Sequence, residues 1–133
     1  MANAIYPIYK AALLGGLTNI DLDGGTVKAA LVDTGTYIYS AAHDFYNDVT
    51  GVVGTPQTIA NTTVTGGLFD GDNVTYTAVS GNTVEAIIIY IDTGNTATSR
   101  LVAYIDTGVT GLPVTPNGGD ISITWNASGI FQL

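Results

Sequence analysis

The chain contains no cysteine, so neither a disulfide framework nor a thiolate metal site is available to it. It is also poor in charge, because charged residues make up 11% of its 133 residues, against about 25% in an average protein. Basic residues are the scarcest: three Lys and Arg face eleven Asp and Glu, a formal net charge of −8. Binding to a nucleic-acid backbone requires clustered Lys and Arg, so we expect no nucleic-acid partner.

Long apolar runs are absent as well. None approaches the roughly 20 residues of a membrane-spanning helix, and the first ten residues lack the basic start of a signal peptide. We therefore expect no membrane partner. We interpret the Asn-X-Ser/Thr triplets at Asn61, Asn73 and Asn126 as chance in a Thr-rich chain.

Motifs for nucleotide chemistry are missing too, since the chain has no phosphate-binding loop and no dinucleotide fingerprint. His43 is the only histidine, and neither a cysteine nor a paired nucleophile accompanies it. We interpret His43 as a structural or surface residue. The sequence offers no positive case for an enzyme, and we expect neither catalytic residues nor a cofactor.

One tripeptide in the chain does have a catalytic use in other proteins. Asp-Thr-Gly, which supplies the paired carboxylates of aspartic proteases, occurs at Asp33, Asp92 and Asp106. A catalytic pair needs only two copies, and the same three residue types also end strands in turns. We therefore interpret all three copies as turns.

Two acidic turns are candidate metal sites. Asp21-Leu22-Asp23-Gly24 and Asp70-Gly71-Asp72-Asn73 offer oxygen ligands for a hard cation such as calcium. Neither matches the calcium-binding loop that ends in a bidentate Glu. Turn-forming Asp and Asn explain both segments without a metal, so the sequence favours turns and leaves calcium binding open.

β-forming sequence is what the chain has in abundance. Residues 84–92 and 98–106 are rich in Val, Ile, Tyr and Thr, and turn formers that include Gly94 and Asn95 separate them. Alternation places apolar side chains on both faces of the first run. We therefore expect a hairpin at the centre of a sheet, with the first strand covered on both faces.

The rest of the chain reads as short strands between turns. We expect a helix from Ser40 to Asp48 and loose chain over residues 52–67, in which Ile59 and Val64 can join a strand. Further strands are expected over residues 26–33 with an extension over 36–39, and over 74–79, 120–125 and 130–133. This pattern predicts one all-β domain, a β-sandwich or jelly-roll-like fold with one or two short helices near the N-terminal half.

The N-terminal segment, residues 1–17, is interpreted separately from the β-rich domain of residues 18–133. The sequence from Pro7 to Leu14 predicts a short helix, because proline suits a first turn and glycine follows. The simpler interpretation packs this helix on its own sheet, and the alternative is an arm that docks on another subunit. The candidate interface residues of such an arm are Ile5, Tyr6, Ile8 and Tyr9.

Six segments spread over nearly the whole chain carry a resemblance to a known group of proteins. They are YPIYK at 6–10, IDL at 20–22, VKAALV at 27–32, YIYSAAHDF at 37–45, GLFDGDNVTY at 67–76 and WNASGIFQL at 125–133. With these segments in this order, the chain resembles small structural proteins in the virions of tailed bacteriophages, some of which are capsid decoration, or cement, proteins.

The resemblance implies a virion structural protein, made in the host cytoplasm, that binds the major capsid protein on the outside of the shell and stabilises it, often as a trimer. Low charge agrees with a chain that buries part of its surface in an assembly. The alternatives are a tail, neck or fibre component of the same particle, or a carbohydrate-binding β-sandwich that stacks sugar on tyrosines and Trp125. Because Trp125 alternates with Ile121 and Ile123, we expect it in the core.

Overall fold

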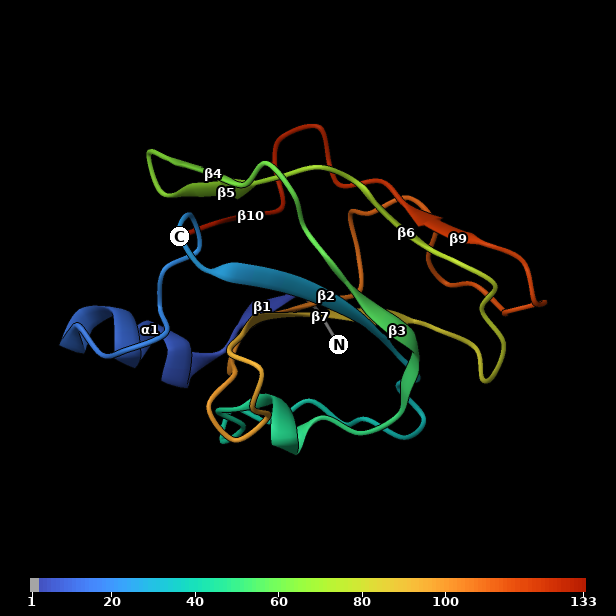
Figure 1. The fold of residues 1–133 in the computed structure, drawn as a ribbon, viewed down its shortest axis with the longest axis horizontal. Helices are drawn as coiled ribbons and strands as arrows, with labels where there is room; N and C mark the ends of the chain where they lie inside the picture. Colours follow the sequence, from blue (N-terminus) through green and yellow to red (C-terminus); the bar gives the residue numbers. More distant parts are fainter. Residues whose placement is uncertain (1–2) are drawn as a thin grey trace.

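The computed structural model describes residues 3–133. Its largest element is an antiparallel sheet of five strands in the order β1-β8-β7-β2-β3, accompanied by sheets in the orders β10-β5-β4 and β6-β9 (Figure 1). The strands are β1 (Ala4–Ile5), β2 (Thr26–Val32), β3 (Val52–Thr58), β4 (Thr63–Thr65), β5 (Leu68–Asp70), β6 (Val74–Tyr76), β7 (Ala86–Asp92), β8 (Arg100–Ile105), β9 (Ile121–Ile123) and β10 (Phe131–Gln132). The helical elements are α1 (Pro7–Gly15) and the 3-10 turn η1 (Tyr46–Asp48).

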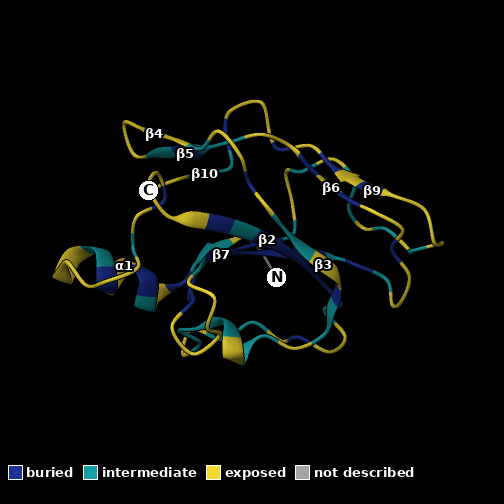
Figure 2. Ribbon diagram, in the orientation of Figure 1, coloured by how far each residue is buried: buried dark blue, intermediate teal, exposed yellow. Residues whose placement is uncertain are grey.

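Strand β7 lies at the centre of the large sheet, and its residues from Ala86 to Ile91 are all buried (Figure 2). It pairs with β2 on one side and with β8 on the other. Its side chains alternate between the two faces of the sheet, with Ile88 on one and Ile87 and Ile89 on the other. The expected central hairpin, covered on both faces, is confirmed.

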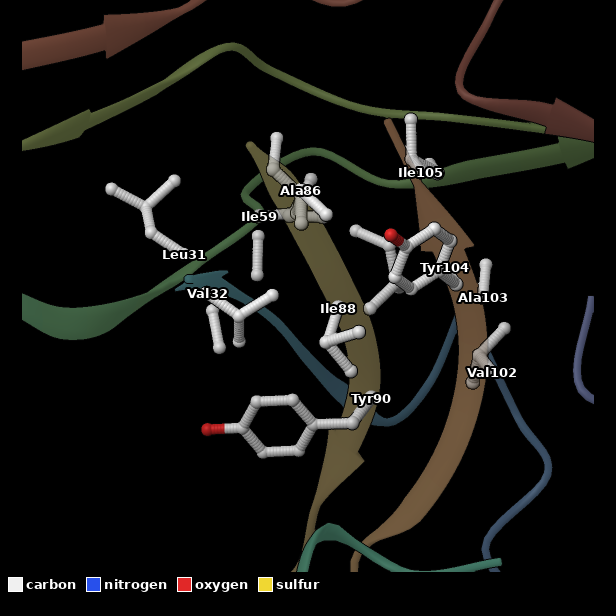
Figure 3. Packing of buried hydrophobic residues seen from close by; sticks show 14 of the residues in the cluster. Leu31, Val32, Ile59, Ala86, Ile88, Tyr90, Val102, Ala103, Tyr104 and Ile105 are labelled. Atoms are coloured by element: carbon white, nitrogen blue, oxygen red, sulfur yellow. The ribbon is translucent and has the colours of Figure 1, made fainter. Parts of the chain in front are cut away.

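One face of the large sheet is covered by the segment between β2 and β3, which contains η1 (Figure 1). Tyr46 of η1 stacks on Tyr90, with ring centroids 4.1 Å apart. Tyr39 meets Tyr104 edge to face at 5.5 Å. Figure 3 shows Tyr90 projecting from β7 and Tyr104 from β8. Such aromatic pairs add roughly 0.5–1.5 kcal/mol beyond the area that they bury, so tyrosines hold this segment on the sheet.

The other face of the large sheet is turned toward the two small sheets (Figure 1). Phe69 of β5, Tyr76 of β6 and Ile123 of β9 are at most 1% exposed. The buried hydroxyl of Tyr76 donates a 2.7 Å hydrogen bond to the carbonyl of Ala29 in β2, which satisfies it without water. The two layers therefore share one core.

The expected all-β class is confirmed, and α1 is the one α-helix in the described part of the chain. The jelly-roll-like part of the expectation is not confirmed. The paired strands are antiparallel, but the small sheets hold only three and two strands beside a sheet of five.

Both edges of the large sheet are protected. At one edge, two segments of the chain form backbone hydrogen bonds with β8. The N–H of Tyr6 donates to a β8 carbonyl, and the N–H of Leu101 in β8 donates to the carbonyl of Asp44. At the other edge, β3 contains Gly54, with a φ of 72°, and Pro56, which has no N–H to offer. Interruptions of this kind prevent another strand from adding to an edge.

The predicted continuation of β2 over residues 36–39 is wrong. The chain turns instead, because the carbonyl of Asp33 accepts the N–H groups of Thr36 and Tyr37. The Asp33 carboxylate closes the same turn by accepting the N–H of Gly35 and the hydroxyl of Thr36. The first Asp-Thr-Gly therefore ends a strand, as its interpretation as a turn predicts.

The predicted helix from Ser40 to Asp48 is also wrong. Ser40 accepts the N–H of Ala42 through its Oγ, as a helix N-cap does, but only η1 is helical. The backbone that would continue the helix pairs with β8, where Phe45 forms a bridge to Arg100. A long-range pairing has replaced the local one.

Residues 52–67, predicted as loose chain, form β3 and β4. Val64 lies in β4, so it does join a strand, as the sequence allowed. Ile59 is 3% exposed and lies just beyond β3, where its N–H donates to the carbonyl of Val27. β3 pairs with β2 through a register shift, which a purely local pattern does not reveal.

The N-terminal segment packs on its own sheet, as the simpler interpretation predicts. β1 pairs with β8, and α1 follows with Pro7 in its first turn. The helix ends at Gly16, whose φ of 63° is left-handed. Tyr9 and Ala12 face the core from α1. The described part of this segment is therefore continuous with the β-rich domain.

We predict that Ile88→Ala destabilises the protein by about 2–5 kcal/mol, because a fully buried side chain of β7 leaves a cavity. The matched control is Ile38→Ala, at a side chain that is 70% exposed, for which we expect a change within about 0.5 kcal/mol. Urea unfolding monitored by tryptophan fluorescence measures both. Equal losses in the two variants would contradict the central role of β7.

Candidate functional site

Exposed apolar side chains gather at one end of the molecule, which we call the apolar end. It is formed by α1, the β4–β5 hairpin and the C-terminus, which lie at the left of Figure 1. Leu14 is 91% exposed, and Leu17, Val64 and Leu133 are each more than half exposed. A groove of about 480 Å³ runs through this end, lined by Tyr9, Leu13, Ile20, Leu22, Val64 and Leu133 together with Asp21 and Asp23.

The end of α1 positions the two exposed leucines. Gly16 reverses the chain, and the N–H of Leu17 donates to the carbonyl of Ala12, which closes the helix. Tyr9 and Ala12 occupy the core side of α1, whereas Leu14 is left in solvent. Leu14 therefore contributes nothing to the core of its own subunit.

A cleft of about 580 Å³ lies at the opposite end of β2 from the apolar end. Leu22, which precedes β2, lines the apolar groove, and Thr34, which follows β2, lines the cleft. We call this feature the acidic cleft, because its charged lining residues are Glu85 and Asp106. Its other lining residues are Tyr37, Ile38, Tyr39, Tyr104, Thr107 and Pro113.

Glu85 is fixed in place at the acidic cleft. Its Oε2 accepts a 3.1 Å hydrogen bond from the backbone N–H of Thr34 and a 3.2 Å bond from the Thr34 hydroxyl. Burial raises the pKa of the Tyr104 hydroxyl, and the nearby negative charges of Asp106 and Glu85 raise it further. Among the described residues, two carboxylates and no basic side chain therefore line the cleft.

A chain of hydrogen bonds leads from the cleft into the core. The Tyr37 hydroxyl lies 2.6 Å from the Tyr6 hydroxyl and 2.8 Å from Nδ1 of His43. Burial raises the pKa of Tyr6, and its bond to Tyr37 adds to the effect. Hydroxyl groups both donate and accept, so this series of hydrogen bonds gives partners to polar groups that would otherwise be buried without one. His43 thus holds Tyr37 in place, in agreement with its interpretation as a structural residue.

The three Asp-Thr-Gly motifs end three different strands. Asp33 follows β2, Asp92 ends β7, and Asp106 follows β8. Asp92 pairs with Thr26 at the start of β2, so the length of β2, about 20 Å, separates it from Asp33. Asp33 and Asp106 lie on opposite sides of β7, at two strand spacings or about 10 Å. Carboxylates that share a proton lie in direct contact, and this arrangement does not provide that.

The acidic turns use their carboxylates to hold the backbone. Asp21 accepts the N–H groups of Gly24 and Asp23 through Oδ1, and these bonds lower its pKa. Asp70 accepts the N–H of Gly71. Within residues 3–133, no group of three or more His, Cys, Asp or Glu is arranged to hold a metal ion.

Trp125 is a core residue, as its alternation with Ile121 and Ile123 predicts. It is 5% exposed, and its indole N–H donates a 2.8 Å hydrogen bond to the carbonyl of Asp72. Its ring therefore offers no open face on which a sugar could stack.

The structure divides the candidate interface residues Ile5, Tyr6, Ile8 and Tyr9 into two kinds. Tyr6 and Tyr9 are at most 1% exposed, and the Tyr9 hydroxyl donates to the carbonyl of Ile20. Both are anchors of their own subunit, which corrects the expectation that they contact a partner. Ile5 and Ile8 are partly exposed, and their part in an interface stays a prediction.

Sequence reasoning did not identify the apolar end. Leu13 and Leu14 are consecutive at the end of α1 and Leu17 lies beyond it, so one buried helix face does not account for all three, and this is the signal that the sequence contained. No local pattern relates them to Val64 and Leu133, which line a groove with Leu13 only through the fold.

Neither a protein-family model nor a curated protein matches the chain. Among the helices in the described part of the chain, none is long and apolar enough to cross a membrane. No matched protein therefore indicates what the chain does, and the proposals below are argued from its own residues and surfaces.

We predict that the stability of the protein falls as the pH rises above about 10. Burial raises the pKa of Tyr6, Tyr76 and Tyr90, and it raises the pKa of Tyr9 to about 12. The unfolded chain loses these protons near pH 10 whereas the folded chain keeps them, so this contribution to stability is complete below pH 10 and is lost above it. Phenolate absorbance and urea midpoints over this range measure the effect. Titration of all eight tyrosines near pH 10 without loss of stability would contradict it.

Proposed function

We propose that this chain is a structural protein of a tailed-phage virion that binds the major capsid protein on the outside of the shell and stabilises it. The protein would be made in the host cytoplasm and join the particle as a decoration, or cement, subunit. Two lines support the proposal: the resemblance of the six sequence segments, and the surface properties of the folded chain.

The observation that carries the proposal is the apolar end. Leu14 is 91% exposed and Leu17 is more than half exposed, and the exposed Val64 and Leu133 line an apolar groove together with Leu13 of α1. Contiguous exposed apolar side chains are typical of surfaces that bind other proteins. Water contact with these side chains is unfavourable, so docking of this end on a shell would lower the free energy.

The charge of the chain supports a position outside the shell. A net charge of −8 repels packaged DNA, which is itself negative. The same charge would keep free subunits soluble despite their apolar end. A cement subunit also needs a rigid scaffold, and the strands β2, β7 and β8 supply one with a core covered on both faces.

A trimer would strengthen such docking. Each subunit presents one apolar end, and a cyclic assembly lets several of them contact the shell at once. Binding of the second and third ends then becomes intramolecular, so a weak contact per subunit is enough for stable attachment.

A tail, neck or fibre component of the same particle would use the apolar end in the same way. The location of the protein on the particle distinguishes these roles from capsid decoration. A carbohydrate-binding function has less support. Trp125 is buried, and the Tyr39 ring already packs between Tyr6 and Tyr104.

We predict that the purified protein binds capsids that lack it and that Leu14→Asp combined with Leu17→Asp lowers its occupancy at least tenfold. Burying one leucine is worth roughly 1.5–3 kcal/mol, and 1.4 kcal/mol corresponds to a factor of about ten. Occupancy would be measured by electron microscopy of the particles and by cosedimentation. We also expect shells with the bound protein to be disrupted at a higher temperature than shells without it.

The control for added negative charge is Ser122→Asp, at an exposed position of β9, far from α1 in Figure 1. It should bind like the wild type. Equal binding by the double variant would rule out docking through the apolar end. Attachment to tails instead of shells would assign the protein to the tail, and failure to bind any part of the particle would contradict a virion function.

Self-association gives a separate prediction. We expect a trimer mass at micromolar concentration in analytical ultracentrifugation. Val64→Asp should leave the trimer intact if the apolar end faces the shell, and should give monomers if the same end forms the contact between subunits. A monomer mass for the wild-type protein, both free and when eluted from shells, would contradict the trimer.

A further inference from the structure

The acidic cleft has the features of a recognition site that the proposed function does not use. We propose that it binds an arginine side chain presented by a protein partner. The guanidinium group would lie against Glu85 and Asp106, and the methylene stem would lie along Ile38 and Pro113. The inference goes beyond the proposed function and does not depend on it, because any protein partner can present this side chain.

Charge complementarity is the first argument. Among the described residues that line the cleft, two are acidic and none is Lys or Arg. The three basic residues of the chain lie elsewhere. Lys28 forms an ion pair with Asp92 at 2.8 Å, Arg100 is 7% exposed and donates to the carbonyl of Thr18, and Lys10 lies in α1. The two carboxylates of the cleft would therefore take their counter-charge from a cation outside the chain.

Preorganisation of Glu85 is the second argument. Both hydrogen bonds from Thr34 fall on Oε2, so the carboxylate is oriented before any ligand arrives and Oε1 is left to meet one. A side chain that is already ordered loses less entropy on binding. Hydrogen bonds between a guanidinium and a carboxylate are charge-assisted and about twice as strong as neutral ones.

The apolar wall of the cleft is the third argument. Ile38 is 70% exposed although it lies away from the apolar end, and Pro113, which lines the same cleft, is exposed too. An arginine side chain covers apolar surface with its methylene groups while its charged end remains among polar partners. This pairing of an apolar wall with a carboxylate suits arginine better than a small inorganic cation.

The tyrosines of the cleft argue against a sugar as the occupant. Sugar stacking requires an open ring face, but the Tyr39 ring lies 5.1 Å from the Tyr6 ring and 5.5 Å from the Tyr104 ring. The Tyr37 ring lies 5.4 Å from that of His43. Arginine is favoured over lysine because its planar guanidinium can bond to more than one acceptor at once.

The test is a titration of the isotope-labelled full chain with a capped Gly-Arg-Gly peptide, followed by the NMR shifts of its backbone amides. The same peptide with citrulline, a neutral isostere of arginine, is the matched ligand control. We expect saturable shifts at Thr34, Ile38 and Thr107, and binding of the citrulline peptide at least about tenfold weaker, as loss of a charged hydrogen bond predicts. Equal affinity for the two peptides, or shifts only at other sites, would overturn the proposal.

Two charge variants sharpen the test. Glu85→Gln keeps an amide oxygen that can accept both bonds from Thr34, so the fold is preserved while the charge is lost, and we expect about tenfold weaker binding. Asp23→Asn removes one charge from the apolar groove, and its affinity for the peptide should not change. If Glu85→Gln binds like the wild type, the site is wrong.

A glucose titration forms the last arm of the experiment. Saturable binding of glucose in the cleft, without binding of the arginine peptide, would overturn the proposal in favour of a sugar site. The peptide assay contains no capsid, and the Leu14 and Leu17 variants change the opposite end of β2. The docking proposal and the cleft proposal can therefore fail independently.

Discussion

The burial of β7 on both faces is the constraint on which the rest of the structure depends. A strand with apolar side chains on each side needs two covering layers, and a chain of this length has few elements to spare. One layer is built from two very small sheets, and the other from an irregular segment that tyrosines hold in place. Hydroxyls such as that of Tyr76 then need buried partners, and they find backbone carbonyls and each other.

This constraint explains how much of the fold the sequence could predict. The strands β2, β7 and β8 and the helix α1 follow from local patterns, because alternation and caps act between near neighbours. The segment from Ser40 to Asp48 has helical signals, yet its backbone pairs with β8, a partner more than 50 residues away. β3 holds Gly54 and Pro56 and is fixed by its pairing with β2.

The candidate sites follow the same division. The roles of Asp33 and of the acidic turns could be predicted, since the turns that they close are local. The cleft could not, because Glu85 and Thr34 meet only through the register of neighbouring strands. The same is true of the apolar end. The two surface features thus lie at opposite ends of β2: a groove whose apolar lining is joined by Asp21 and Asp23, and a cleft lined by Glu85 and Asp106.

The closed edges of that sheet determine how copies of the chain can meet. Long open strands invite neighbours to add by backbone pairing, a process that has no natural end and leads to fibrils when molecules are crowded. Here the backbone of Tyr6 and that of Asp44 already form hydrogen bonds along the outer edge of β8. At the other edge of the sheet, Gly54 and Pro56 interrupt β3. Copies of the chain therefore cannot readily extend the large sheet by backbone pairing, and side chains, whose shapes limit the number and orientation of neighbours, make the contacts at its edges. We therefore expect a surface crowded with such molecules not to grow fibrils from the large sheet.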